Sequence, residues 1–171
     1  MKKLTLLLMI MASLLFASCS KPMIAGTKIE DTPTNREVLT VFYAYAKAMQ
    51  EMDAPGLEAL ISKNYYDRNG TDIPADDVDF DGVVQFLNSP EYKNLLRVHT
   101  TYIMKDLQIK SPTEAVIFYF YELQAKRSTK LPTDKQELAV AEGTRWMKVS
   151  DEMVMTIKKE KDGKWLIVDG L

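Results

Sequence analysis

The chain has 171 residues, which is the length of one ordinary domain. Hydrophobic residues make up 46% and charged residues 27%, with a net charge of −2. This composition argues against a disordered chain, and against a dedicated nucleic-acid binder, which needs a basic excess. One cysteine and one histidine exclude an internal disulfide, a multi-cysteine zinc cluster and a His-His metal motif.

The N-terminus predicts an exported protein. Two lysines precede an apolar run over 4–17, which is shorter than the roughly 20 residues of a membrane-spanning helix and is typical of a secretory signal. Ala17 and Ser18 stand directly before Cys19 and resemble the lipobox of bacterial lipoproteins, although Phe16 replaces the usual aliphatic residue. The resemblance implies cleavage after residue 18 and acylation of Cys19. The alternative is an ordinary signal peptide that contains a cysteine.

The same resemblance predicts a location. Ser20, rather than an aspartate, follows the cysteine, which in Gram-negative lipoproteins implies export to the outer membrane. Several acyl chains would anchor the protein firmly, whereas one chain would not. We therefore expect three segments: a signal peptide over 1–18, a lipidated tether over 19–31, and a folded domain over 32–171.

Helices are predicted in the first half of this domain. The first begins near Thr34, which forms a capping box with Glu37. Its apolar face recurs every three or four residues, at Val38, Phe42, Tyr45, Met49 and Met52. Asp53 caps a second, short helix, and residues 82–95 form a third after an acidic loop over 71–81.

From residue 98 onward the apolar period changes to two, which predicts antiparallel strands. The alternation reverses near Lys105 and Asp106, which indicates a β-bulge. Turns follow at 111–114 and at 161–164, where an Asp-Gly pair stands between apolar segments, and a polar loop covers 128–143. Helices followed by a meander of long strands predict an α+β domain.

This order of elements resembles the NTF2-like superfamily, which is also called SnoaL-like or ketosteroid-isomerase-like. The resemblance covers residues 34–171. It rests on the long first helix, the short helix over 55–62, the Tyr65-Tyr66-Asp67 segment, and the strands over 115–121 and 158–167. It implies a cone, in which a strongly bent sheet wraps the long helix and leaves a pocket at the open end.

No catalytic residue is predicted. Isomerases and dehydratases of this superfamily use a buried aspartate or histidine as a base, often beside a tyrosine or an acid. Asp67, Asp106 and Asp169 are the carboxylates near predicted strands, but no acid–base pair is recognisable by spacing. His99 shares a face with Arg97, which places it on the outer side of the sheet. We therefore expect a protein without catalysis and without a cofactor.

Aromatic residues with polar tips are the predicted ligand-binding set. They could line the cone and hydrogen-bond a small apolar ligand. The alternative is that aromatic residues in strands only build the core. The predicted set is Tyr66, Tyr102, Tyr119, Tyr121 and Trp146.

An acidic motif predicts a weak calcium site. Asp77, Asp79 and Asp81 stand in the D-x-D-x-D-G pattern that begins a calcium loop. The twelfth position is Asn88, so the usual bidentate glutamate is missing. The alternative is an acidic turn in which Asp79 or Asp81 caps the third helix.

Three functions remain open. The first is a non-catalytic envelope lipoprotein that binds a small apolar ligand or a protein partner and self-associates through a second apolar sheet face at Val154, Leu166 and Val168. The second is an enzyme that abstracts a proton from a hydrophobic carbonyl compound, and the third is a calcium-stabilised surface module. A buried carboxylate facing the cavity would favour the enzyme. A cavity lined only by tyrosine, tryptophan and aliphatic residues would favour binding.

Overall fold

A computed structural model describes residues 21–128 and 144–171. The chain divides into two compact units, Met1–Asp31 and Thr32–Leu171. In the first, Met23 bridges Glu30 in an antiparallel pair, and Lys21 forms an ion pair with Glu30 at 2.8 Å. The predicted signal peptide, Cys19 and the predicted polar loop lie wholly or almost wholly outside the described residues. Within the described ranges, no helix combines the length and hydropathy that crossing a membrane requires.

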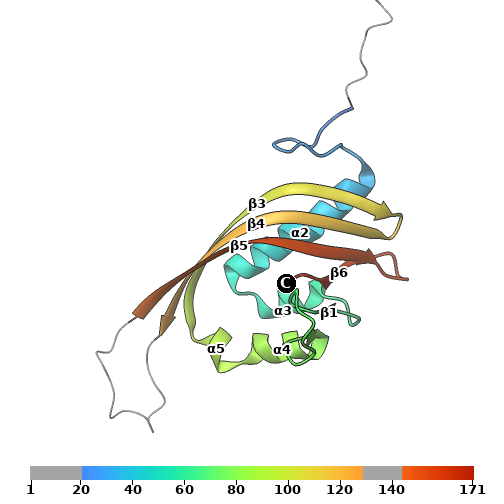
Figure 1. The fold of residues 1–171 in the computed structure, drawn as a ribbon. Coiled ribbons are helices and arrows are strands. Elements are labelled where there is room, and N and C mark those ends of the chain that lie inside the picture. Colours follow the sequence, from blue (N-terminus) through green and yellow to red (C-terminus); the bar gives the residue numbers. More distant parts are fainter. Residues whose placement is uncertain (1–20, 129–143) are drawn as a thin grey trace, which may run out of the picture. The chain divides into compact units, whose positions relative to one another are not determined.

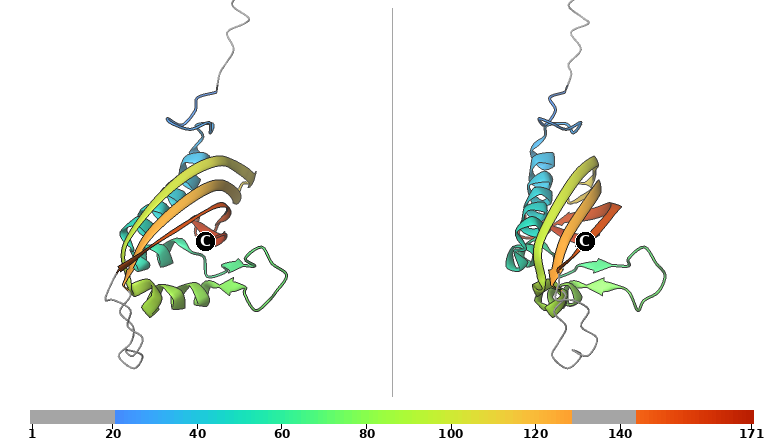
Figure 2. Two further views of the ribbon diagram at one scale, coloured as in Figure 1. Left: turned by 60° about the vertical axis from the view of Figure 1, so that its left-hand side comes forward. Right: turned by 90° about the vertical axis from the view of Figure 1, so that its left-hand side faces the viewer.

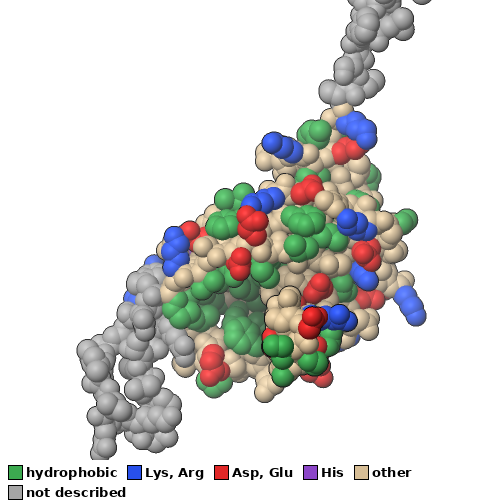
Figure 3. Space-filling view, viewed as in Figure 1, with side chains coloured by type: hydrophobic (Ala, Val, Ile, Leu, Met, Phe, Trp, Pro, Cys, Tyr) green, Lys and Arg blue, Asp and Glu red, His purple; other side chains and the backbone are tan. Residues whose placement is uncertain are grey.

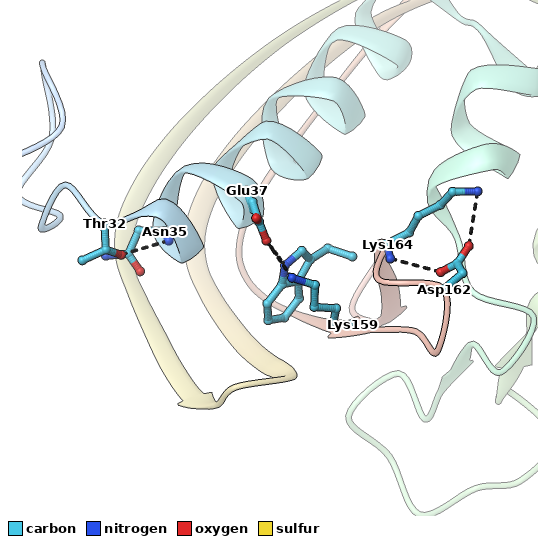
Figure 4. Close-up of polar contacts among 7 residues, drawn as sticks. Thr32, Asn35, Glu37, Lys159, Asp162 and Lys164 are labelled. Atoms are coloured by element: carbon cyan, nitrogen blue, oxygen red, sulfur yellow. Dashed lines mark hydrogen bonds and ion pairs between the residues drawn. The ribbon is translucent and has the colours of Figure 1, made fainter.

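The long helix α2 spans Pro33–Glu51. Its N-cap is Thr32, whose hydroxyl accepts a hydrogen bond from the backbone N–H of Asn35 at 3.1 Å (Figure 4). The predicted capping box at Thr34 is therefore wrong: Pro33 occupies the first turn, where a missing N–H costs nothing, so the helix begins one residue before Thr34. The short helix α3, Ala54–Leu60, is capped by Asp53 as predicted.

The sheet has four antiparallel strands in the order β3-β4-β5-β6. They span Leu95–Ser111, Glu114–Ser128, Thr144–Lys159 and Trp165–Asp169. The register shifts between Met104 and Asp106, which confirms the predicted bulge. The long strands bend together, and α2 lies along their concave side (Figure 1).

The main core lies between α2 and the concave face of the sheet. Its most deeply buried side chains come from α2, β4, β5 and β6: Val38, Phe42, Ile117, Tyr119, Met155, Ile157 and Ile167. The odd-numbered face of β4 points inward, as the alternation predicts. Glu37 also joins helix to sheet, since it accepts hydrogen bonds from Lys159 Nζ at 3.0 Å and Trp165 Nε1 at 2.8 Å (Figure 4).

Four small elements, two strands and two helices, form the opposite side of the domain. Strands β1 (Tyr66–Asp67) and β2 (Val78–Asp79) pair in a short ribbon that the sequence did not predict. Figure 2 shows that the loop of this ribbon extends away from the sheet. Helix α4 spans Phe80–Asn88 and α5 spans Pro90–Lys93. Asp79 caps α4 by accepting from the N–H of Gly82 at 2.8 Å, which is the capping role weighed for it above.

Candidate functional site

A cavity of about 400 Å³ lies between α2, α3, α4 and the β1–β2 ribbon. Figure 3 shows a hollow with hydrophobic walls between the sheet and α4. Most of the walls are apolar: Tyr45, Met49, Leu57, Ile61, Val78, Val83, Phe86 and Leu87.

One carboxylate reaches the cavity from a buried position. Asp67 on β1 lines the cavity, yet only 8% of its surface is exposed. Its Oδ1 accepts from the N–H of Asn69 at 2.7 Å, and its Oδ2 accepts from the Tyr65 hydroxyl at 3.1 Å and from the N–H of Gly170 at 3.3 Å. These donors satisfy a group that would otherwise be costly to bury.

Tyr65 completes a polar junction between β1 and the segment after β6. Its hydroxyl donates to Asp67 and accepts from the N–H of Leu171 at 3.2 Å. Burial raises the pKa of Tyr65, so the phenol stays protonated and remains a donor. Gly170 has a φ of +85°, and a Cβ there would clash with the carbonyl oxygen of Val154. Only glycine therefore fits at this junction.

A second carboxyl group lies beside the first. The pKa of Asp169 is raised, mainly by burial and then by the negative charge of Asp67, with which it also hydrogen-bonds. Both effects favour the protonated form of Asp169. Asp67 thus has a second carboxyl group as its neighbour at this end of the cavity.

The rim of the cavity is acidic. Asp77 and Asp79 line it together with Asn69. Asp77 accepts a hydrogen bond from the Tyr66 hydroxyl, and Asp79 caps α4. Among the residues that the structure describes, no group of three or more acidic, histidine or cysteine side chains is arranged to hold a metal ion. The calcium hypothesis for Asp77, Asp79 and Asp81 stays a sequence-based prediction.

The predicted ligand-binding tyrosines lie elsewhere. Tyr102, Tyr119 and Tyr121 belong to an aromatic cluster on the inner sheet face, where Phe42 packs edge-on against Tyr119 with ring centres 5.3 Å apart. Tyr119 is 2% exposed and serves as core. Tyr45 connects this cluster to the cavity, since it lines the cavity and its ring lies 5.9 Å from that of Tyr102.

Tyr66, the remaining predicted tyrosine, does not line the cavity either. Tyr66 is 50% exposed on the side of β1 opposite Asp67, because successive side chains of a strand point to opposite faces. His99 is exposed on β3. Trp146 belongs to β5, but its side chain lies outside the described part of the chain.

Sequence reasoning missed Asp67 and Tyr65 as cavity residues. The available signal was the alternation in Tyr65-Tyr66-Asp67, which places the first and third side chains on one face. It could not be used without knowing that a two-residue strand exists there. The partner of Asp67 at Gly170 and the partner of Tyr65 at Leu171 are about a hundred residues away and leave no local pattern.

Comparisons with known proteins agree on the fold. In sequence comparisons, no family model and no curated protein matches the chain. Among solved structures, a ketosteroid isomerase-like protein from Erwinia carotovora is 14% identical, with a TM-score of 0.59 over 82% of this chain and 95% of that one. An NTF2-like protein from Shewanella oneidensis is 13% identical, with a TM-score of 0.54 over 81% and 97%. The association domain of Caenorhabditis elegans CaMKII is 15% identical, with a TM-score of 0.53 over 80% and 92%.

These likenesses confirm the predicted fold class. The domain is an α+β cone of the NTF2-like type, with helices packed in a strongly bent antiparallel sheet. Identities this low establish the architecture and leave the chemistry to the residues of the cavity.

Proposed function

We propose that this domain is a non-catalytic binding module that holds a small, largely apolar molecule in the cavity between α2, α3 and α4. The observation that carries the proposal is the cavity itself. Its volume of about 400 Å³ falls in the range of small-molecule sites, and its lining is mostly apolar with a few polar groups at one end. Phe86 lines it and is still 55% exposed, so bound ligand would cover apolar surface.

Titration with the neutral apolar dye N-phenyl-1-naphthylamine in detergent-free buffer tests this proposal. The dye should fluoresce on binding, and Val83→Phe should abolish the signal because the larger ring fills the cavity. Gln85→Phe is the matched control, since it places the same ring on an exposed position of α4. Equal dye binding by both variants would contradict the proposal.

A second candidate is an enzyme that abstracts a proton from a hydrophobic carbonyl compound. Asp67 favours it, because a buried carboxylate does face the cavity and a protonated tyrosine lies beside it. Binding is the better-supported function for a physical reason. Three donors already surround Asp67, and accepting a proton from a substrate would weaken all three hydrogen bonds.

Deuterium exchange distinguishes the two functions. A bicyclic ketone small enough for the cavity is incubated with the protein in D2O, and loss of its α-proton signals is followed by NMR. The binding module should give the uncatalysed rate. Faster exchange that disappears in Asp67→Asn, while Asp72→Asn retains it, would make the protein an enzyme.

The proposal includes a location in the bacterial outer membrane, through lipid on Cys19. Its support is the signal-like N-terminus and the lipobox resemblance. Labelled palmitate should enter the wild-type protein in cells, and the label should be lost in Cys19→Ser. The wild type should sediment with outer membranes. Recovery of unlabelled wild type in the soluble fraction would contradict this part of the proposal.

We further propose that two copies associate through the convex face of the sheet. Ile103 on β3 and Val154 on β5 are 54% and 47% exposed on either side of the half-buried Phe118 and Phe120. One of the similar folds belongs to a domain named for association. Sedimentation should give a dimer that Val154→Lys dissociates. Gln85→Lys, on the exposed surface of α4 and not on the sheet, is the control and should leave the dimer intact. A wild-type monomer at high concentration would exclude it.

A further inference from the structure

We propose that the ligand of this cavity carries a positive charge, as an amine or quaternary ammonium group attached to an apolar body. This inference rests on the proposed binding function and names the class of ligand. It is drawn from the charges of the cavity and from the surroundings of Asp67.

The charged residues that line the cavity all have one sign. Asp67, Asp77 and Asp79 are acidic, and no lysine, arginine or histidine stands among the described lining residues. Two basic residues close to these carboxylates in the sequence do not line the cavity: Lys63 lies 3.5 Å above the ring of Phe80, and Arg68 is exposed. An apolar enclosure with carboxylates at one end strengthens their attraction for a cation, because the local dielectric is low.

Asp67 is the innermost of these groups and lacks a cationic partner among the contacts described for it. Its partners are a phenol, two backbone N–H groups and the carboxyl group of Asp169, and none of them is a cation. A buried carboxylate is stabilised most strongly by an opposite charge, and its two oxygens can accept about four hydrogen bonds. No cation therefore compensates the charge of the carboxylate that lines the cavity, and a ligand ammonium group would supply the missing charge.

The arrangement also disfavours other ligands of the same shape. A neutral alcohol could donate a hydrogen bond to a lining carboxylate but would leave its charge uncompensated. A carboxylate would meet three negative side chains and no positive one. The order of affinity should therefore be ammonium, then alcohol, then carboxylate.

Three probes with one apolar body test this order: 1-adamantanemethylamine, 1-adamantanemethanol and 1-adamantanecarboxylate, titrated calorimetrically at pH 7 and low salt. We expect the amine to bind about tenfold more tightly than the alcohol, because a charged hydrogen bond replaces a neutral one. Equal or weaker binding of the amine would overturn the inference and leave the binding function intact. Failure of all three probes, and of the neutral dye, would overturn both.

Conservative variants locate the effect. Asp79→Asn keeps a good helix cap and removes one charge, and Asp77→Asn keeps an acceptor for Tyr66. Each should weaken amine binding about threefold and leave alcohol binding unchanged, as expected for one partly screened charge pair. Asp72→Asn, an exposed change in the same ribbon loop that does not line the cavity, is the control.

Salt provides a measurement that needs no mutation. Raising the ionic strength shortens the range of electrostatic attraction, so amine affinity should fall while alcohol affinity stays constant. If salt changed the affinities of the amine and the alcohol equally, the rim carboxylates would not select the ligand. The same conclusion would follow if Asp72→Asn and Asp79→Asn lost equal amine affinity.

Discussion

The two halves of this domain are held together in different ways. On one side, α2 and the concave face of the sheet bury large side chains completely, as with Phe42, Ile117 and Ile157. On the other, α3, α4 and the β1–β2 ribbon surround a cavity. They contact the sheet through the bridge between Ile61 and Ile167 and through the polar junction at Asp67. The packed half therefore provides most of the stability, and the open half tolerates an unfilled space that a ligand could occupy.

The largest difference should appear when one side chain is truncated in each half. Phe42→Ala should lower the free energy of unfolding by about 3–5 kcal/mol, because it leaves a void among closely packed rings. Val83→Ala should cost less than about 1 kcal/mol, since Val83 already faces empty space. Urea denaturation measures both. Similar losses would show that the open half is packed as tightly as the other.

A pair of glycines tests the junction between the halves. Gly170 and Gly163 have similar positive φ angles of +85° and +87°. A Cβ added at Gly170 would clash with backbone atoms, whereas one added at Gly163 would meet no atom within 4 Å. Gly163→Ala should cost about 1–2 kcal/mol for the left-handed conformation alone. Gly170→Ala should cost distinctly more and should also reduce dye binding, because it displaces the N–H that Asp67 accepts. If thermal denaturation showed the same loss of stability for both variants, the close backbone contacts of Gly170 would not be needed for the junction.

Asp169 makes the junction sensitive to pH. Its pKa is raised above the ordinary value of 3.8, so the folded state holds the proton more tightly than the unfolded state, and stability from this group falls as pH rises through the raised pKa. Asp169→Asn mimics the protonated form. The variant should be more stable than the wild type at pH 7, and the two should converge below about pH 3.8. Denaturation curves at both pH values check this, and a variant that is less stable at pH 7 would contradict it.

The smallest expected effect lies in the packed half, at its surface. The hydrogen bond from Lys159 and the one from Trp165 lower the pKa of Glu37 below its ordinary value of 4.5. Stability from Glu37 is therefore present above 4.5 and is lost as pH falls through the lowered pKa. Glu37→Gln should be slightly destabilising at pH 7 and indistinguishable from the wild type in strong acid. If the stability difference between Glu37→Gln and the wild type were the same at all pH values, the effect would come from packing and not from the charge of Glu37.

The packed half could be predicted from the sequence because its signals are local and repeated. The period in α2 identified its buried face at Val38, Phe42 and Tyr45, and the reversal near Lys105 located the bulge. The helix start was misplaced because Thr32 and Thr34 both offer a capping hydroxyl around Pro33. Choosing between them depends on geometry that the pattern does not contain.

The open half could not be predicted in the same way. Asp67 is buried by contacts with Gly170, far along the chain, and a two-residue strand has no periodicity. Tyrosines such as Tyr119 were interpreted as ligand-binding because they are aromatic and lie in strands, but the bent sheet turns them toward α2. The residues that line the cavity were thus determined by tertiary contacts rather than by residue type.

The proposed binding function requires that a small apolar molecule enters the cavity of the open half. Methyl NMR during titration with 1-adamantanemethanol tests it most directly. We expect saturable shifts in the methyl signals of Leu57, Val83 and Leu87, which line the cavity. The methyl signals of Ile103 and Val154 on the convex face should stay unchanged. Shifts confined to Ile103 and Val154, or no shifts at all, would contradict it.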